Sequence, residues 1–133
     1  MKQFMLILCC ISVLVLLGGC MEKGKKQNRK QVDFTVCTES QVPSEVKKMI
    51  EEKKHTPFQF TYNLQEYMYI VIGYGEQNGG GYSIKIVECS EDKVNMYVDT
   101  TLLGSEESVD SDLKSYPYIV IKCIKPKKNV IFL

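Results

Sequence analysis

The sequence predicts an α+β domain that is mostly β, a curled antiparallel sheet of about six to seven strands with one packed helix. Stretches in which apolar and polar residues alternate recur along the chain, and short turns rich in glycine or polar residues separate them. Only the stretch from Ser44 to Lys54 has the apolar spacing of a helix. Because strands joined by short turns pair antiparallel, the helix is expected to pack on an antiparallel sheet.

A processing signal precedes the predicted domain. Met1 and Lys2 are followed by an apolar run, Phe4–Leu17, which is shorter than the roughly 18 residues that a membrane-spanning helix needs. Residues 1–19 are therefore expected to be a signal peptide. Leu17-Gly18-Gly19-Cys20 resembles the lipobox of bacterial lipoproteins, which implies a lipid on Cys20 and attachment to the extracytoplasmic face of the bacterial cell membrane. The alternative is a soluble secreted protein with a chance cysteine at position 20.

Residues 20–31 are expected to form a basic flexible tether, and residues 32–133 a single domain. The tether carries five cations and one acid, whereas residues 32–133 carry 11 Lys and Arg against 15 Asp and Glu, a formal net charge of −4. An acidic domain is a poor partner for a phosphate backbone, which argues against nucleic acid. The tether either stays near anionic lipid headgroups or serves only as a solvated spacer.

The first ordered elements are expected to be a strand and the helix. Residues 31–38 alternate, and their buried face should consist of Val32, Phe34 and Val36. Pro43 suits the first turn of a helix, because its fixed φ matches and its missing N–H is not needed there. The helix should turn its charged side chains to water and a narrow apolar stripe to the sheet; the stripe is Val46, Met49 and Ile50.

A central β-hairpin is predicted after a short aromatic strand. The aromatic strand, Pro57–Tyr62, should place three rings on one side, those of Phe58, Phe60 and Tyr62. The hairpin strands are Tyr67–Gly75, a run of β-branched and aromatic residues, and Tyr82–Cys89, which alternates. Residues 76–81 join them, and Asn78-Gly79 supplies the positive φ angles that a reversing backbone needs.

Three further strands complete the predicted sheet. Lys93–Thr101 alternates and should pair with the preceding strand through a turn at Ser90–Asp92. Residues 102–115 are polar and acidic, which is typical of a loop. Pro117 opens a strand at Tyr118–Ile124, where its missing N–H does least harm to the ladder. The turn at residues 125–129 leads into a last strand at Val130–Leu133.

Two short motifs carry a resemblance to a known family. The first is Gly75-Glu76-Gln77-Asn78-Gly79-Gly80-Gly81-Tyr82-Ser83-Ile84, and the second, further along, is Tyr116-Pro117-Tyr118-Ile119-Val120. Together they resemble the C-terminal domain family of the protease complex subunit PrcB, over residues 66–133. The resemblance implies a non-catalytic, surface-tethered accessory subunit that helps a secreted protease to mature or to stay stable.

The same motifs supply the candidate partner-binding residues, which are Gly79, Gly80, Gly81, Tyr82, Tyr116, Pro117 and Tyr118. An open glycine loop lets another backbone come close, and exposed tyrosines offer rigid area and a hydroxyl at interfaces. The alternative is that the glycines serve only a turn and the tyrosines only packing. The Tyr116–Pro117 peptide is either trans or cis.

Signals for catalysis or for a metal are weak. His55 is the only histidine, and it is expected to lie at the end of the helix. No complete GxGxxG, GxSxG, HExxH or paired CxxC motif is present. The acidic loop lacks the spacing of a calcium loop, although it offers four carboxylates: Glu106, Glu107, Asp110 and Asp112. We therefore expect no enzyme activity, no cofactor and no metal.

Three cysteines fall in the predicted domain: Cys37, Cys89 and Cys123. By strand parity, Cys37 and Cys89 should face the polar side and Cys123 the apolar side. One disulfide plus a buried thiol would suit an oxidising compartment. The alternative is three buried free thiols that act as small hydrophobes, and the odd number also allows an intermolecular bridge.

A second class of function stays open beside the accessory role. The chain could be a small-ligand or ion-binding lipoprotein of the cell envelope. Such a protein would show a concave polar pocket in its sheet. The oligomeric state is left open by the sequence.

Overall fold

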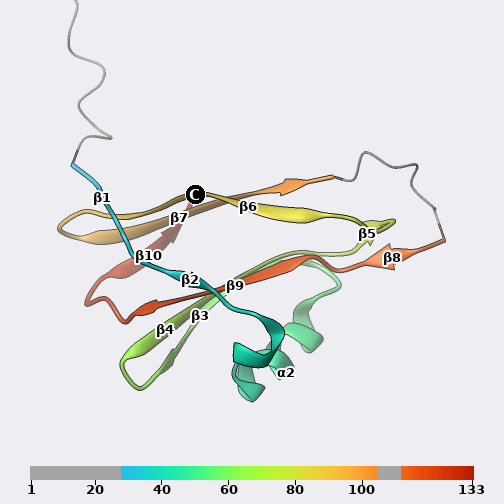
Figure 1. The fold of residues 1–133 in the computed structure, drawn as a ribbon, viewed down its shortest axis with the longest axis horizontal. Helices are drawn as coiled ribbons and strands as arrows, with labels where there is room; N and C mark the ends of the chain where they lie inside the picture. Colours follow the sequence, from blue (N-terminus) through green and yellow to red (C-terminus); the bar gives the residue numbers. More distant parts are fainter. Residues whose placement is uncertain (1–27, 105–111) are drawn as a thin grey trace, which may run out of the picture.

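The structure, a computed structural model, describes residues 28–104 and 112–133 and has a layered arrangement (Figure 1). Two four-stranded sheets face each other, and helix α2 packs on the outer face of the second sheet. This confirms the predicted class, a mostly β α+β domain with a packed helix. The predicted signal peptide, residues 1–19, and the predicted lipidation site Cys20 lie outside the described residues. Within the described ranges, no helix has the length and hydropathy needed to span a membrane.

The described chain forms the following elements in order: β1 (Lys30–Gln31), β2 (Thr35–Val36), η2 (Glu39–Gln41), α2 (Ser44–Lys53), β3 (Pro57–Leu64), β4 (Tyr67–Tyr74), β5 (Gln77–Asn78), β6 (Ser83–Glu91), β7 (Asn95–Leu103), β8 (Lys114–Ser115), β9 (Tyr118–Ile124) and β10 (Asn129–Phe132). Sheet A has the order β1-β6-β7-β10, sheet B has the order β2-β9-β4-β3, and β5 pairs with β8. The pairs are antiparallel except that β10 runs parallel to β7. The chain therefore crosses from sheet B to sheet A between β9 and β10.

Side chains of both sheets meet in a core between them. Alternate residues of β4 and β9 point into it from sheet B, and residues of β6 and β7 from sheet A. The buried members are Met68, Ile70, Ile72, Cys89, Met96, Val98, Ile119, Ile121 and Cys123. Burial of one such large aliphatic side chain contributes about 1.5–3 kcal/mol, so this core is a main source of stability.

Helix α2 covers the other face of sheet B, as the sequence predicts. Val46 and Ile50 of the apolar stripe are 0% and 2% exposed, and Met49 is half-buried. Pro43, predicted in the first turn, lies one residue earlier, at the N-cap, with a ψ of 146° outside the helical range. Val46 and Ile50 pack in one cluster with three buried residues of sheet B, Tyr69, Val71 and Val120. Three aromatic rings of β3 join the same cluster, also as predicted: Phe58, Phe60 and Tyr62.

The prediction of a central hairpin is wrong, because β4 and β6 lie in different sheets. β4 pairs with β3 and β9, whereas β6 pairs with β1 and β7. Residues 68–73 of β4 are all buried, since one face lies in the core between the sheets and the other under α2. A strand buried on both faces is most stable with a neighbour on each side. Residues 75–82, here called the glycine loop, therefore cross from sheet B to sheet A.

The predicted first strand, residues 31–38, is split in two. β1 pairs with β6 in sheet A and β2 with β9 in sheet B, so residues 30–37 cross from one sheet to the other (Figure 1). We call this segment the strap; its first two residues, assigned to the tether in the sequence analysis, form β1. Val32 packs against the core as predicted, but Phe34 and Val36 are 39% and 48% exposed. Cys37, expected on the polar side, is half-buried and packs near α2. The crossing breaks the alternation, because no single sheet face runs along the strap.

The β6–β7 hairpin is confirmed, but a β-bulge changes its faces. The register shifts between Ile86 and Glu88, which leaves Val87 54% exposed and turns Cys89 into the core. The prediction that Cys89 faces the polar side is therefore wrong, since strand parity does not survive a bulge. The Cys123 prediction is confirmed, because this residue is buried in the same core.

Asp92 closes the β6–β7 turn. Its Oδ1 accepts hydrogen bonds from the backbone N–H groups of Val94 (2.8 Å) and Asn95 (2.7 Å), and its Oδ2 accepts one from the Tyr97 hydroxyl (2.7 Å). These hydrogen bonds, the one from Asn95 first, lower the pKa of Asp92 to about 2. The side chain of Val94 is 68% exposed because it lies in this turn, before the start of β7.

We expect the Asp92 carboxyl to titrate with a pKa of about 2 in the folded protein, against about 3.9 in an unfolded chain. Because the folded value is the lower one, the carboxylate stabilises the fold fully above the unfolded pKa. That contribution is lost as the pH falls through the folded pKa. Carbon-detected NMR of the carboxyl resonance measures the midpoint, and Asp92→Asn should remove this part of the pH dependence. A midpoint close to the unfolded value would contradict the prediction.

Candidate partner-binding site

Both motifs of the candidate site lie at one end of the molecule, away from the point where the described chain begins (Figure 1). β5 pairs with β8, so that Asn78 lies opposite Lys114. The N–H of Gly79 donates to the carbonyl of Leu113 (2.6 Å), and the Ser115 hydroxyl donates to the carbonyl of Gly79 (2.6 Å). The glycine loop and residues 113–118 therefore form one surface, here called the loop end.

Three glycines give the loop its shape. Gly75, Gly79 and Gly81 have φ angles of 74°, 84° and 79°, in the left-handed region that other residues avoid. Gly80 does not have a positive φ angle. A Cβ at this position would lie 3.5 Å from a methyl group of Leu113, which is an ordinary van der Waals distance. Of the candidate glycines, Gly79 and Gly81 are thus needed for the backbone, and Gly80 can be substituted without strain.

Tyr116 is held on three sides by residues from distant parts of the chain. Its hydroxyl donates to Glu76 Oε1 (3.1 Å), and this hydrogen bond raises the pKa of Tyr116. The ring meets His55 edge to face at 5.0 Å between centroids, and Lys54 Nζ lies 5.1 Å from the ring centroid. His55 follows α2 as expected, but no sequence motif links it or Lys54 to Tyr116. Only the fold brings the end of the helix to the loop end.

The other candidate residues differ in exposure. Tyr82 is half-buried, and its hydroxyl donates to the carbonyl of Asn78 (2.7 Å). This hydrogen bond links two residues of the glycine loop and stabilises its conformation. The Tyr116–Pro117 peptide is trans, and the carbonyl of Pro117 accepts from the N–H of Tyr74 (3.0 Å). Tyr118 is 41% exposed, and partial burial raises its pKa. The structure therefore brings the two motifs together but leaves Tyr118 as the most open of their tyrosines.

Leu113 is a residue of this end that sequence reasoning missed. Its side chain is 54% exposed, next to the backbone contact with Gly79. A large apolar side chain directly between Asp112 and Lys114 was the available signal. Beside it, Lys114 Nζ donates to Asn78 Oδ1 and ties β8 to the glycine loop.

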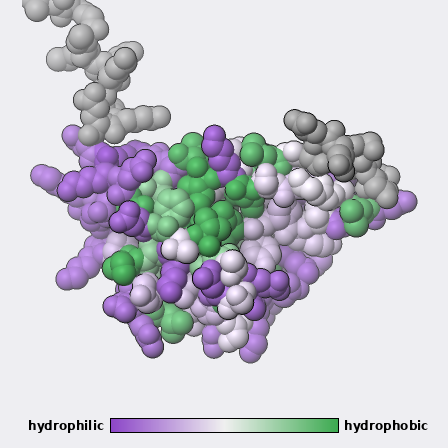
Figure 2. Space-filling view, viewed as in Figure 1, coloured by the Kyte–Doolittle hydropathy of each residue, from purple (hydrophilic) through white to green (hydrophobic). Residues whose placement is uncertain are grey.

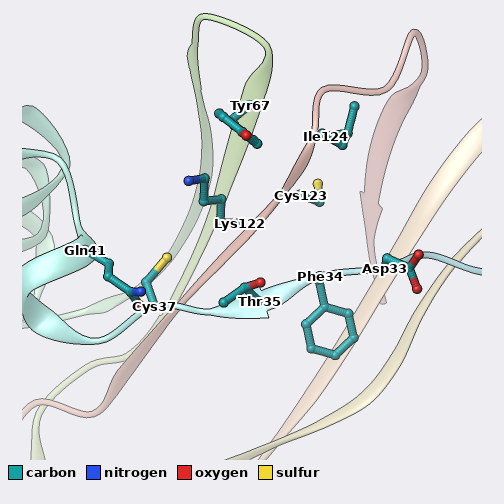
Figure 3. A pocket seen from close by; sticks show the side chains of 9 residues that line it. All are labelled: Asp33, Phe34, Thr35, Cys37, Gln41, Tyr67, Lys122, Cys123 and Ile124. Carbon is teal, nitrogen blue, oxygen red and sulfur yellow. The ribbon is translucent and has the colours of Figure 1, made fainter.

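A separate hollow of about 430 Å³ lies where the strap passes β9 and the start of β4 (Figure 3). It is open to solvent, and more of its lining is apolar than polar. Lys122 lies in it with its ammonium group 4.0 Å from the ring centroid of Tyr67. The lining residues are Asp33, Phe34, Thr35, Cys37, Gln41, Tyr67, Lys122, Cys123 and Ile124. A concave site beside the sheet is thus present, although it is less polar than the alternative function required.

The cysteines of the domain are all free thiols: Cys37, Cys89 and Cys123. Burial raises the pKa of Cys89 and the pKa of Cys123 to about 11. Burial also raises the pKa of Cys37, although this thiol reaches the hollow of Figure 3. The structure therefore has free thiols in place of a disulfide within the chain, although only Cys89 and Cys123 are buried as that alternative expected.

We expect an alkylating reagent at pH 8 to modify Cys37 first and to reach Cys89 and Cys123 only after unfolding. Cys89 and Cys123 are 7% and 4% exposed, and a thiol with a pKa of about 11 is almost wholly protonated at this pH. Peptide mass spectrometry after timed alkylation, with and without denaturant, measures the order. Equal rates at the three sites in the native protein would contradict it.

Metal ligation finds no support in the described part of the chain. Within residues 28–104 and 112–133, no group of three or more His, Cys, Asp or Glu side chains is arranged to hold a metal ion. Of the four acidic loop residues, only Asp112 is described, and the others, Glu106, Glu107 and Asp110, lie outside the described residues.

In a comparison with family models, residues 68–123 match the family described as PrcB C-terminal. The matched segment runs from the second residue of β4 to the second-last residue of β9 and includes both motifs of the loop end. This confirms the resemblance that the sequence predicts. No curated protein and no solved structure gives a significant match to the chain.

Proposed function

From the match of residues 68–123 to the PrcB C-terminal family, we propose that this protein is a non-catalytic accessory subunit that binds a secreted protease and assists or stabilises it. The proposal includes a lipid on Cys20 that holds the protein on the extracytoplasmic face of a bacterial membrane. The observation that carries the proposal is that the matched segment contains the whole loop end described above.

The loop end has the properties that a protein contact needs. It offers two exposed side chains with large contact area, Leu113 at 54% and Tyr118 at 41%. Its backbone is held by the Gly79 hydrogen bonds and by the Tyr116 contacts, so little order has to be created on binding. Preorganised surfaces lose less conformational entropy when they bind, which favours affinity.

Cross-linking on intact cells, followed by mass spectrometry of the captured chains, tests the partner. We expect a secreted or cell-wall protease to be captured, and Leu113→Glu to lower its recovery at least tenfold, because a charge would be buried at an interface centre. Val87→Glu is the matched control, since Val87 has the same 54% exposure but lies on sheet A. Tyr116→Phe removes only the hydrogen bond to Glu76 and should cause a smaller loss.

Two outcomes would overturn the accessory role. One is the absence of any reproducible protease at native expression. The other is an equal loss for Leu113→Glu and Val87→Glu, which would remove the loop end from the contact. Circular dichroism of each purified variant separates a lost contact from a lost fold.

Labelling with a clickable palmitate analogue tests the anchor. We expect the wild-type chain to incorporate the label and to remain with the membrane fraction, and Cys20→Ala to do neither, because the thiol is the acylated group. An unlabelled wild-type chain in the culture medium would show that the anchor is absent, whatever the outcome of the protease capture.

A second candidate function is small-ligand binding in the envelope, and the hollow of Figure 3 supports it. A mostly apolar wall with one ammonium group would suit a small amphiphile that carries an acid group. Thermal-shift measurements with fatty acids of graded length test this, with Lys122→Gln as the variant that should lose the shift. No shift for any chain length would remove this candidate.

A further inference from the structure

The end of the molecule opposite the loop end combines exposed aliphatic side chains with lysines. The β6–β7 turn carries Lys93 and Val94, and β9 ends at Ile124 directly before Lys125. Val94 and Ile124 are 68% and 66% exposed, the two highest values among the large hydrophobic side chains of residues 28–104 and 112–133. Exposed aliphatic groups beside cations are typical of surfaces that meet a lipid interface.

These turns are neighbours in space. The parallel pairing of β10 with β7 puts Asn129 opposite Asn95, so the β9–β10 turn lies beside the β6–β7 turn. Lys128 Nζ forms an ion pair with Glu91 at 3.0 Å. The described chain also begins here, because β1 pairs Lys30 with Glu91. The N–H of Lys125 donates to the carbonyl of Glu66 (2.8 Å), which brings the β3–β4 turn to the same place. We call this surface the lysine end; it comprises residues 28–30, 91–95 and 124–128, the β3–β4 turn, and Glu88, which pairs with Arg29.

The charge of the lysine end is opposite to that of the domain as a whole. Figure 2 shows hydrophilic side chains gathered at this end, on the left of the view. Its cations are Arg29, Lys30, Lys93, Lys125, Lys127 and Lys128, and its acids are Glu66, Glu88, Glu91 and Asp92. Three of the acids are bound within the protein. Glu88 accepts hydrogen bonds from Arg29 and Ser90, Glu91 pairs with Lys128, and Asp92 holds its turn.

Among the residues named, Glu66 is the exposed acid. The surface charge of this end is therefore dominated by four exposed lysines, Lys30, Lys93, Lys125 and Lys127. Residues 32–133 nevertheless carry a net charge of −4. Lysines also lie on α2 and elsewhere, but at the end where the chain enters the domain the cations outnumber the acids. A uniformly solvated surface needs no such separation, whereas an oriented contact with an anionic surface does.

We propose that the lysine end docks on anionic lipid headgroups, with Val94 entering the headgroup layer. The inference rests on the lipid anchor of the proposed function. Cys20 and Asn28 are eight residues apart, so even an extended link between them spans at most about 28 Å. Each lysine close to an anionic surface strengthens binding about fivefold. Docking at this end turns the loop end away from the membrane, toward a partner in the surrounding space.

The absence of tryptophan makes a direct test available, because a single introduced tryptophan is the only one in the chain. The lipidated protein carrying Val94→Trp is reconstituted into vesicles of phosphatidylcholine alone, or with about one third phosphatidylglycerol to give a negative surface potential, with bromine on the acyl chains. Leu113→Trp at the loop end is the matched control, since Leu113 is also an exposed apolar residue, at 54%. Intact mass confirms the lipid before reconstitution.

We expect bromine to quench Val94→Trp in the anionic vesicles and to leave Leu113→Trp unquenched. Lys93→Glu, Lys125→Glu and Lys127→Glu together should lower the docked-to-undocked ratio at least a hundredfold and abolish the quenching. High salt should weaken it as well, because it screens the headgroup charge. Equal quenching at the two ends, or no quenching of Val94→Trp in anionic vesicles, would overturn the proposal. The quenching measurements do not depend on the protease capture, so they test membrane docking independently of the accessory role.

Discussion

Ile121→Ala lowers the free energy of unfolding by about 3 kcal/mol, within the usual range of about 2–5 for removing a buried isoleucine side chain. Ile121 is 0% exposed and lies between Val36 on β2 and Ile70 on β4, in the core between the sheets. Its neighbours come from strands on both sides, so they have little freedom to fill the cavity. For a domain of this size, the melting temperature should fall by about 12–24 °C.

Ile124→Ala is the matched control for this experiment, because it makes the same change three residues further along the same strand. The side chain of Ile124 is 66% exposed, so the loss should stay within about 0.5 kcal/mol. Urea unfolding followed by circular dichroism measures both variants. A similar loss for the two would mean that the core does not lie between the sheets as described.

Gly75→Ala is expected to destabilise the protein by about 3 kcal/mol, through two effects. The first is the left-handed backbone, which costs about 1–2 kcal/mol with a Cβ; the φ of Gly75 is 74°. The second is overpacking, which costs about 1–3 kcal/mol, because the new Cβ would lie 2.9 Å from the backbone nitrogen of Pro57. Backbone atoms cannot turn aside as a flexible side chain would. The glycine loop should therefore shift, and capture of the partner should weaken with it.

Gly80→Ala tests the same loop without either effect. Gly80 has no positive φ, and a Cβ there makes only ordinary contact at 3.5 Å. Its stability should stay within about 0.5 kcal/mol of wild type, or rise slightly because the unfolded chain loses entropy. Thermal unfolding compares the pair, and equal losses at Gly75 and Gly80 would contradict the described loop.

Local patterns were enough to predict most of the individual elements. The helix, the aromatic strand β3, the β6–β7 hairpin and the strand that Pro117 precedes occur as predicted, because each depends on spacing within about ten residues. The pairing of β4 was beyond such patterns. Its burial on both faces was visible as a continuous apolar run, but the choice of neighbours depended on β9, which lies some fifty residues away in the chain.

The candidate site was predicted as two motifs but not as one surface. Nothing local links the glycine loop to Tyr116; the β5–β8 pairing does, and it involves only two residue pairs. The partners of Tyr116 at the end of α2 follow from packing between layers. Cys89 was assigned to the wrong face for a related reason, because a single bulge at Val87 reverses the parity of the residues after it.

The strap decides how the domain would respond to mechanical tension. A pull applied where the described chain begins acts first on two short ladders, each of only two residue pairs, β1 on β6 and β2 on β9. The ion pair between Arg29 and Glu88 and the stacking of Arg29 on Tyr97 reinforce only the first of them. The β3–β4, β4–β9 and β6–β7 ladders are longer and lie behind the strap. Under tension, the two strap ladders would separate before the longer ladders break. The domain would therefore unfold in at least two steps, and the loop end would stay folded during the first.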